Sequence, residues 1–126
     1  MGENMKKTIM IIDDEESMRD ILNDIITEHG YNVILCKNGA DGLQTYNNRQ
    51  KEIDLVITDV MMPIMNGYEF FTQAKKINSQ IKVIIMSGYS NKLAQEFIDE
   101  GALEFIQKPM RLLFMMEIIQ KHIGVS

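Results

Sequence analysis

The sequence predicts an α/β fold, in which five parallel strands form a doubly wound sheet with helices on both faces. Five short apolar runs alternate with stretches whose apolar residues recur at helical spacing. Such alternation implies parallel strands joined by right-handed crossovers. Polar residues capable of chemistry follow four of the five runs. If the strand order is 2-1-3-4-5, these four strands are consecutive neighbours, and the second strand is at an edge.

The third apolar run is the clearest predicted strand. It covers residues 53–58, ends directly before Asp59, and is followed by a loop that contains Pro63 and Gly67. An apolar run of this length between turn residues is typical of a strand buried on both faces. A carboxylate at the mouth of such a strand loses hydration unless cations or hydrogen bonds compensate it. The predicted strands are residues 8–12, 31–36, 53–58, 82–86 and 103–106.

The stretches between these runs show the spacing of amphipathic helices. In the first, apolar residues recur at intervals of three and four, and Gly30 follows where a C-terminal cap belongs. Gly101 has the same place after the fourth. The predicted helices are residues 15–29, 40–48, 68–77, 91–100 and 111–122. Ligands of an open sheet in this flavodoxin-like order bind beyond the carboxyl ends of the strands, at the switch point.

Composition excludes several classes of function. A chain of 126 residues is large enough for one domain with a real core, and its net charge of −5 argues against direct binding to nucleic acid. No apolar stretch is long enough to span a membrane. Cys36 is the single cysteine and lies in an apolar run, which favours a buried, inert thiol. Residues 1–7 lack the apolar centre of a signal peptide, so we expect residues 1–5 to be a loose tail and the location to be cytoplasmic.

The residues at the strand ends suggest a common site. Asp13, Asp14 and Asp59 would repel one another unless a cation were present, and a hard divalent ion such as Mg²⁺ suits carboxylate ligands. Lys108 adds a mobile positive charge, and Ser87 offers a hydroxyl to an added oxyanion. A carboxylate beside a metal and a lysine is suited to accept a phosphoryl group through its oxygen. We therefore expect Asp59 to be the chemical centre.

Each of these residues also has an ordinary structural interpretation. An Asp-Asp pair at a helix start, as at residues 13–14, is most often an N-cap. Ser87-Gly88 alone is most often a turn, and Lys108-Pro109 alone is most often a solvated loop. Asp59 is harder to explain in this way because it directly ends a buried strand. The coincidence of all these residues at one sheet edge favours the functional interpretation.

Over residues 6–123 the chain resembles the CheY-like receiver domain of two-component response regulators. The resemblance depends on motifs in family order and at family-like spacing, and we expect the domain to occupy residues 6–126 after the tail. It implies a signalling phosphoacceptor and not an enzyme, one that assists only its own phosphorylation and dephosphorylation. The motifs are Asp13-Asp14, Asp59 followed by Met62-Pro63 and Gly67, Ser87-Gly88, and Lys108-Pro109.

The resemblance also implies a role for each site residue. Asp59 would accept the phosphoryl group from a phosphohistidine on a partner histidine kinase or phosphotransfer protein. Asp13, Asp14, Asp59 and the backbone carbonyl of Met61 would hold Mg²⁺. Up to residue 126 we expect no DNA-binding or catalytic output domain beside the receiver. A stand-alone receiver, a relay intermediate and a piece of a longer regulator or hybrid kinase therefore stay open.

The same resemblance implies a switch. Ser87 would donate to the phosphoryl group, Lys108 would form an ion pair with it, and Phe105 would turn inward when Ser87 moves. The Lys108-Pro109 peptide would be cis. The family often has tyrosine where Phe105 stands and threonine where Ser87 stands. Met61 and Tyr89 occupy the positions that tune dephosphorylation, and neither readily orients an attacking water. We therefore expect a comparatively long-lived phosphoryl-aspartate.

The last predicted helix carries a second signal. At 100° per residue its core face holds five apolar residues, whereas Phe114 and Ile118 lie well away from that face. Scattered surface apolars need no explanation. The alternative is a contact patch for a homodimer or an output partner. It would belong to the surface formed by the fourth helix, fifth strand and fifth helix, which would change when the protein is phosphorylated. The core-face residues are Leu112, Met115, Met116, Ile119 and Ile123.

Two other functions compete with this interpretation. A Mg²⁺-dependent phosphatase or phosphotransferase could use Asp59 as a nucleophile on small molecules. Phosphatases of the haloacid dehalogenase type usually carry Asp-x-Asp after the first strand, whereas here Asp59-Val-Met61 follows the third and lacks the second acid. A flavodoxin-like cofactor binder would need a hydroxyl-rich phosphate loop, but the acidic residues 13–16 would repel a phosphate. The receiver interpretation accounts for more of the sequence.

Overall fold

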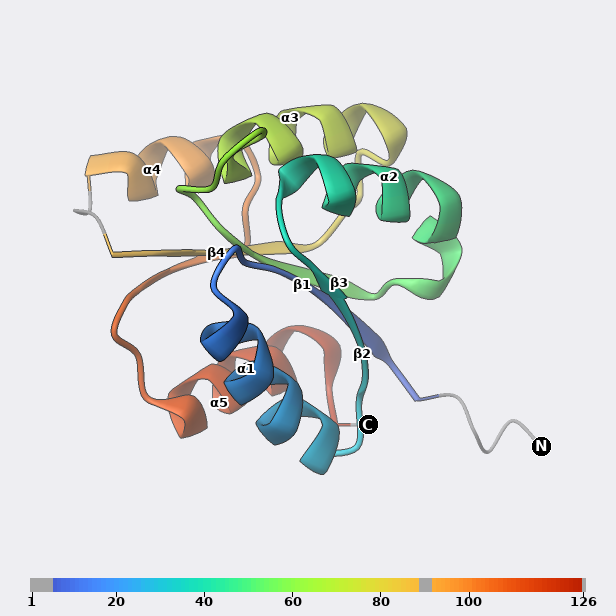
Figure 1. Ribbon diagram of the computed structural model, residues 1–126, viewed down its shortest axis with the longest axis vertical. Coiled ribbons are helices and arrows are strands. Elements are labelled where there is room, and N and C mark those ends of the chain that lie inside the picture. Colours follow the sequence, from blue (N-terminus) through green and yellow to red (C-terminus); the bar gives the residue numbers. More distant parts are fainter. Residues whose placement is uncertain (1–5, 89–91, 126) are drawn as a thin grey trace.

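The structure is a computed structural model, and it describes residues 6–88 and 92–125 (Figure 1). The expected tail, residues 1–5, lies outside the described residues. A five-stranded sheet has the order β2-β1-β3-β4-β5, and every strand pair is parallel. The predicted fold class and strand order are confirmed. The strands are β1 (Thr8–Ile12), β2 (Asn32–Cys36), β3 (Leu55–Asp59), β4 (Val83–Ser87) and β5 (Glu104–Gln107).

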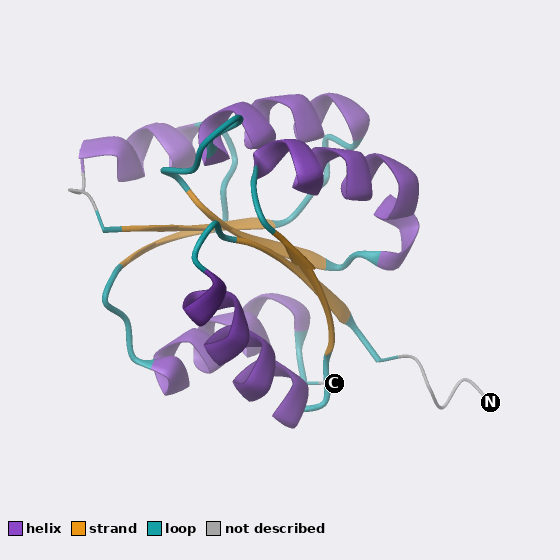
Figure 2. Cartoon of the chain, in the orientation of Figure 1, coloured by secondary structure: helices purple, strands orange, loops and turns teal. Residues whose placement is uncertain are grey.

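Helices cover both faces of this sheet (Figures 1 and 2). Three of them, α2, α3 and α4, lie on one face, and α1 and α5 lie on the other. A short 3-10 helix, η1, leads into β3 and was not expected from the sequence. The helices are α1 (Glu16–Glu28), α2 (Gly39–Arg49), η1 (Gln50–Glu52), α3 (Gly67–Ile77), α4 (Lys92–Asp99) and α5 (Leu112–Ile123).

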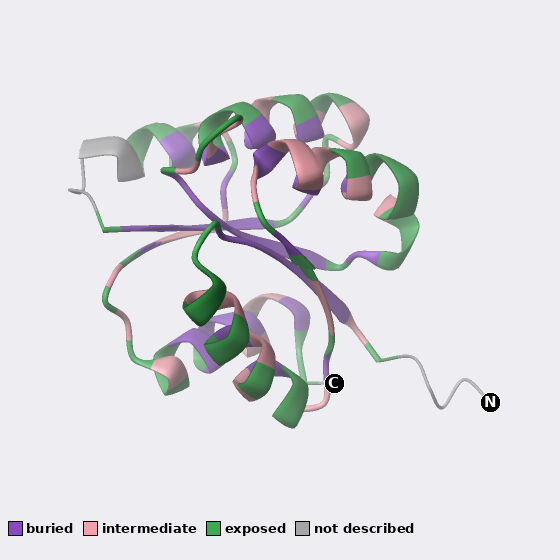
Figure 3. Cartoon of the chain, in the orientation of Figure 1, coloured by how far each residue is buried: buried purple, intermediate pink, exposed green. Residues whose placement is uncertain are grey.

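Each face of the sheet has its own apolar core (Figure 3). Successive strand residues point to opposite faces, so Ile9 and Ile11 face α1 and α5, whereas Met10 and Ile12 face α2 and α3. β1, β3 and β4 are buried along their whole length. Continuous burial explains why these strands were readily predicted from apolar runs. Cys36, the last residue of β2, is buried as expected.

The helix starts depend on local side-chain caps. Asn66 is the N-cap of α3 and forms a capping box with Glu69, in which each side chain accepts a hydrogen bond from the other residue's backbone N–H. Asn38 caps α2 in a similar way, because its side chain accepts from the N–H of Asp41. These caps set the points at which the chain leaves the carboxyl ends of β2 and β3. No helix in the described ranges is long and apolar enough to cross a membrane.

The structure corrects the sequence prediction for one residue of α5. Ile118 is only 7% exposed and belongs to the same core as Met115 and Ile106, so it is not part of a surface patch. The prediction was wrong because it centred the buried face on Leu112, Met116 and Ile119. The buried face is wider than that stripe and extends round the helix to Ile118. A helix that packs on a sheet often buries such a broad face.

Candidate functional site

The strand ends meet where the sequence predicted. Asp59 is the last residue of β3, and the N–H of Val60 next to it continues the ladder to the carbonyl of Met86. Asp13 directly follows β1, and its N–H donates to the carbonyl of Cys36. The N–H of Lys108 donates to the carbonyl of Ser87 at 2.7 Å. Each of these residues therefore continues a hydrogen-bonded strand, which fixes the backbone from which its side chain projects.

Three carboxylates converge at this edge of the sheet. One oxygen of each of Asp13, Asp14 and Asp59 lies within 4.8 Å of the others. Asp13 is fully buried, Asp59 is 8% exposed, and Asp14 faces solvent. The predicted alternative of an N-cap does not hold, because the N-cap of α1 is Glu15. Its N–H donates to Oδ1 of Asp13 at 2.9 Å, which orients that carboxylate.

Lys108 joins two of these acids. Its ammonium donates to Oδ2 of Asp13 at 3.0 Å and to Oδ2 of Asp59 at 3.1 Å. Burial acts to lower the pKa of Lys108, but the hydrogen bonds and charges of the two acids outweigh it and raise that pKa above its ordinary value. Burial raises the pKa of Asp59, and the charge of Lys108 opposes this only in part. A further cation beside Asp59 would therefore stabilise its ionised carboxylate.

The donor set fits a divalent cation. Three carboxylates and one ammonium leave a formal charge of −2 in a small, partly buried volume. Oδ1 of Asp59 already accepts the N–H of Val60 at 2.8 Å, and Oδ1 of Asp13 accepts that of Glu15. All the ligand atoms are hard oxygens, which Mg²⁺ prefers. The residues present therefore suit the ion that the sequence predicted.

The loop after β3 is packed tightly under Asp59. A Cβ atom on Gly67 would lie 2.3 Å from the carbonyl oxygen of Asp59, so only glycine fits at that position. The N–H of Gly67 also donates to the carbonyl of Val60 at 2.8 Å. The carbonyl of Met65 accepts the N–H of Gly39 at 3.0 Å, which ties the loop to the start of α2. These contacts hold the first turn of α3 against the site.

The two expected switch residues lie on neighbouring strands. Ser87 ends β4, is fully buried, and is paired in register with Gln107 of β5. Phe105 lies two residues earlier on β5, is half-buried, and packs against the core under α3 and α4. The Lys108-Pro109 peptide is cis, as predicted. The roles of Ser87 and Phe105 in switching stay predictions.

Two charged residues near the site were not predicted. Glu15 places its carboxylate 3.9 Å from the ammonium of Lys108, and the guanidinium of Arg19 donates to the backbone carbonyl of Asp13 at 2.8 Å. They are four residues apart, hence on one face of the first helix, directly after the two acids. This four-residue spacing is the signal in the sequence that could have identified them. Using it requires knowing that the start of α1 lies over the carboxyl ends of the strands.

Comparison with known proteins agrees with this geometry. The family model of the response regulator receiver domain matches residues 9–120. The chain belongs to the response regulator receiver family. It is 34% identical to the chemotaxis protein CheY of Thermotoga maritima over 93% of this chain and 98% of that protein. It is 31% identical to sporulation initiation phosphotransferase F of Bacillus subtilis, over 97% of this chain and 98% of that protein.

Receiver sequences also occur within longer relatives. The chain is 36% identical to part of the 3',5'-cyclic-nucleotide phosphodiesterase regA of Dictyostelium discoideum, but it spans only 14% of that protein. Among solved structures, a receiver domain protein from Clostridium thermocellum has a TM-score of 0.88 at 28% identity, with 94% of each chain covered. The response regulator TrrA of Thermotoga maritima, solved with Mg²⁺ and beryllofluoride, has a TM-score of 0.82 at 28% identity, with 91% of this chain and 97% of that chain covered.

The receiver's expected tuning residues are only partly described. The side chain of Met61 is 53% exposed beside the site. Tyr89 lies outside the described residues.

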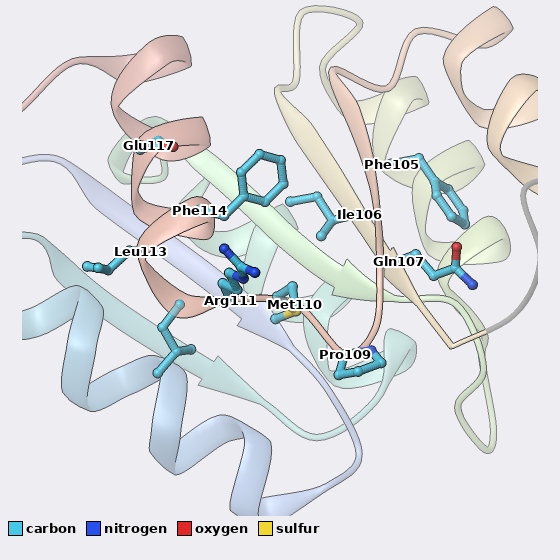
Figure 4. A pocket seen from close by; sticks show the side chains of 10 residues that line it. Phe105, Ile106, Gln107, Pro109, Met110, Arg111, Leu113, Phe114 and Glu117 are labelled. Atoms are coloured by element: carbon cyan, nitrogen blue, oxygen red, sulfur yellow. The ribbon is translucent and has the colours of Figure 1, made fainter.

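Phe114, the remaining member of the predicted patch, is 47% exposed and lines a groove of about 720 Å³ between β5 and α5 (Figure 4). Its ring points toward Ile106, whereas the ring of Phe105 lies on the other side of β5.

Proposed function

We propose that this receiver accepts a phosphoryl group on Asp59 from a phosphohistidine of a partner histidine kinase or phosphotransfer protein in the cytoplasm. The observation that carries the proposal is the Lys108 ammonium, which bridges Asp59 and Asp13 at the carboxyl edge of the sheet. That arrangement places a cation against a carboxylate whose side chain is still 11% exposed to solvent. The proposed domain occupies residues 6–126.

In the proposed reaction Oδ2 of Asp59 is the nucleophile, because it is the oxygen that lies beside the Lys108 ammonium, whereas Oδ1 accepts the backbone N–H of Val60. A bond forms between Oδ2 and phosphorus, the bond from phosphorus to the imidazole nitrogen breaks, and its electron pair returns to the imidazole. Lys108 already contacts Oδ2 and would then pair with the phosphoryl oxygens. The hydroxyl of Ser87 would donate to one of those oxygens.

Asp13, Asp14 and Asp59, with the backbone carbonyl of Met61, are the proposed ligands of Mg²⁺. The ion would supply charge neutralisation to the transferring group. The convergence of three carboxylate oxygens within 4.8 Å supports this assignment. The chain does not turn over a separate substrate in this scheme, so it acts as a signalling phosphoacceptor and not as an enzyme.

The proposed output surface includes Phe114 and the more exposed Leu113, on α5 beside the groove. Ile118 is excluded because it is buried. Contact with a second copy or with an output partner would cover these apolar side chains. Light scattering of wild type and Phe114→Glu, with and without beryllofluoride, tests the dimer. Monomers in every sample would exclude it.

Phosphoramidate tests the chemistry, because its phosphorus-nitrogen bond resembles that of phosphohistidine. We expect ³¹P NMR to show a protein acyl phosphate when wild type is mixed with phosphoramidate and Mg²⁺. The resonance should be absent from Asp59→Asn and should not form after Mg²⁺ is chelated. An equal resonance in Asp59→Asn would contradict the assignment of the acceptor.

A further inference from the structure

Four aromatic rings form a chain from β5 to the surface of α3. Phe97 of α4 is the central ring, and its centroid lies 6.3 Å from that of Phe105 on β5. On its other side Phe97 contacts two rings of α3, Phe71 at 6.3 Å and Tyr68 at 5.6 Å. The Tyr68 contact is edge-to-face, with 69° between the ring planes. One buried ring therefore touches the expected switch residue and α3 at once.

Phe97 has little freedom to absorb a movement of Phe105. It is 1% exposed, and buried side chains are packed as closely as molecules in organic crystals. A displaced neighbour in such a core forces a discrete rearrangement and not a gradual deformation. A movement of the Phe105 ring toward Phe97 would therefore displace Phe97 toward Phe71 and Tyr68.

The two α3 rings differ in how firmly they are held. Phe71 is 1% exposed, and the ammonium of Lys75 lies 5.2 Å from its ring centroid. Lys75 also donates to the backbone carbonyl of Glu100, after the end of α4. Tyr68, in contrast, is 41% exposed and has a free face toward solvent. Of the two rings, Tyr68 is thus the one with room to move if Phe97 is displaced.

We propose that Phe97 is a positioning residue that passes the state of Phe105 to Tyr68, so that the α3–α4 surface around Tyr68 changes when Asp59 is phosphorylated. This inference rests on the proposed function, because it needs an occupied site to move Phe105. It adds a second surface to the one at β5 and α5. The two surfaces lie on opposite sides of β5, where Phe105 and Ile106 point apart (Figure 4).

Glu100, directly after α4, contacts two residues of α3, Tyr68 and Lys75. Hydrogen bonding to the Glu100 carboxylate raises the pKa of the Tyr68 hydroxyl, while the Glu100 backbone carbonyl accepts from Lys75. Both contacts tie the end of α4 to α3. A shift of Tyr68 therefore changes how α4 is fastened, as well as the exposed ring itself.

Fluorine NMR tests the inference directly. The protein has four tyrosines, so labelling with 3-fluorotyrosine gives four signals. The signal that is missing from Tyr68→Phe is the one from Tyr68. Mg²⁺ and beryllofluoride serve as the phosphoryl analogue, and the bound fluorides are seen in the same spectrum. We expect the Tyr68 signal of wild type to shift when beryllofluoride binds. In Phe97→Leu the bound-fluoride signals should persist while the Tyr68 shift is lost.

Matched variants separate this mechanism from a direct effect of the site on α3. Phe70→Leu removes a buried ring of the same helix that is outside the four-ring chain, and the Tyr68 shift should remain. Phe105→Leu interrupts the chain at its other end, and the shift should be lost. It replaces Phe97→Leu as the test if that variant does not fold. The inference is overturned if the Tyr68 signal does not shift in wild type. It is also overturned if the signal shifts as much in folded Phe97→Leu or Phe105→Leu as it does in wild type. Absent bound-fluoride signals in wild type contradict the proposed function itself.

Discussion

The ammonium of Lys108 lies 3.1 Å from Oδ2 of Asp59, in a contact from which most water is excluded. The side chain of Lys108 is 14% exposed and that of Asp59 is 11% exposed. Asp13, on the other side of Lys108, is fully buried. Because the ammonium neutralises two acids that face each other, the site depends on it for stability as well as for chemistry.

Removing this ammonium should destabilise the protein when no metal is present. For Lys108→Met we expect the free energy of unfolding in chelator to fall by about 3 kcal/mol, because the fully buried Asp13 and the largely buried Asp59 are left without a cation. Saturating Mg²⁺ should restore part of the loss. Urea unfolding with EDTA and with Mg²⁺ measures both. Lys121→Met is the control, since its ion pair with Glu104 is exposed and should cost less than about 1 kcal/mol. Equal losses in the two variants would contradict the assignment.

Met61 should control how long the phosphoryl group persists. Its exposed thioether beside the site cannot readily orient a water molecule for attack on phosphorus. We expect Met61→Asn to lose phosphate several-fold faster than wild type, because the amide can hold such a water. Met61→Leu should match wild type. Both rates can be followed by intact mass after the phosphodonor is removed. Equal or slower loss in Met61→Asn would contradict this role.

Ile64 is strained. Its φ is 70°, in the left-handed region that β-branched residues rarely adopt, and its side chain is 81% exposed. Asparagine tolerates this conformation, and almost no buried apolar contact is lost in the exchange. We expect Ile64→Asn to raise the free energy of unfolding by about 1 kcal/mol. Ile64→Val keeps the branched Cβ and should give no gain. Thermal unfolding of the three proteins checks this, and a loss in Ile64→Asn would show that the side chain makes a stabilising contact.

Glu104 should make stability depend on pH. Burial acts to raise its pKa, but hydrogen bonds from His122 and Lys121 outweigh it, and the pKa lies below its ordinary value. A lowered pKa in the folded state gives stability that is complete above the ordinary glutamate pKa and is lost as pH falls through the lowered value. Glu104→Gln should therefore be less stable than wild type by about 1 kcal/mol at pH ~6, and the difference should be smaller at pH ~3. Urea unfolding at both pH values tests this. An equal difference in acid would mean that packing, and not charge, is responsible.

The core strands were predictable because burial is continuous along them. β1, β3 and β4 are apolar runs bounded by turn residues, and β1 has its predicted bounds, whereas β3 and β4 each end one residue later than predicted. β5 was displaced by one residue as well, and it is a partly exposed edge strand that contains Glu104 and Gln107, so its apolar signal is weaker. The 3-10 helix Gln50–Glu52 has no apolar periodicity at all.

The site was predictable from one rule, that parallel strands deliver their carboxyl ends to one edge. Applied to the sequence, this rule brings Asp13, Asp59 and Lys108 together. It does not give the orientation of a helix above that edge, so Arg19 was missed. Ile118 was misplaced for a related reason. Periodicity gives the direction of the buried face, but its width depends on what the helix packs against.

Intact-mass measurement after incubation with acetyl phosphate shows whether Asp59 accepts a phosphoryl group. Wild type should gain one phosphoryl group in the presence of Mg²⁺, and Asp59→Asn should gain none. Asp20→Asn, which removes an exposed acid of α1, should gain one as wild type does. A phosphoryl group on Asp59→Asn, or none on wild type with Mg²⁺ present, would contradict the account.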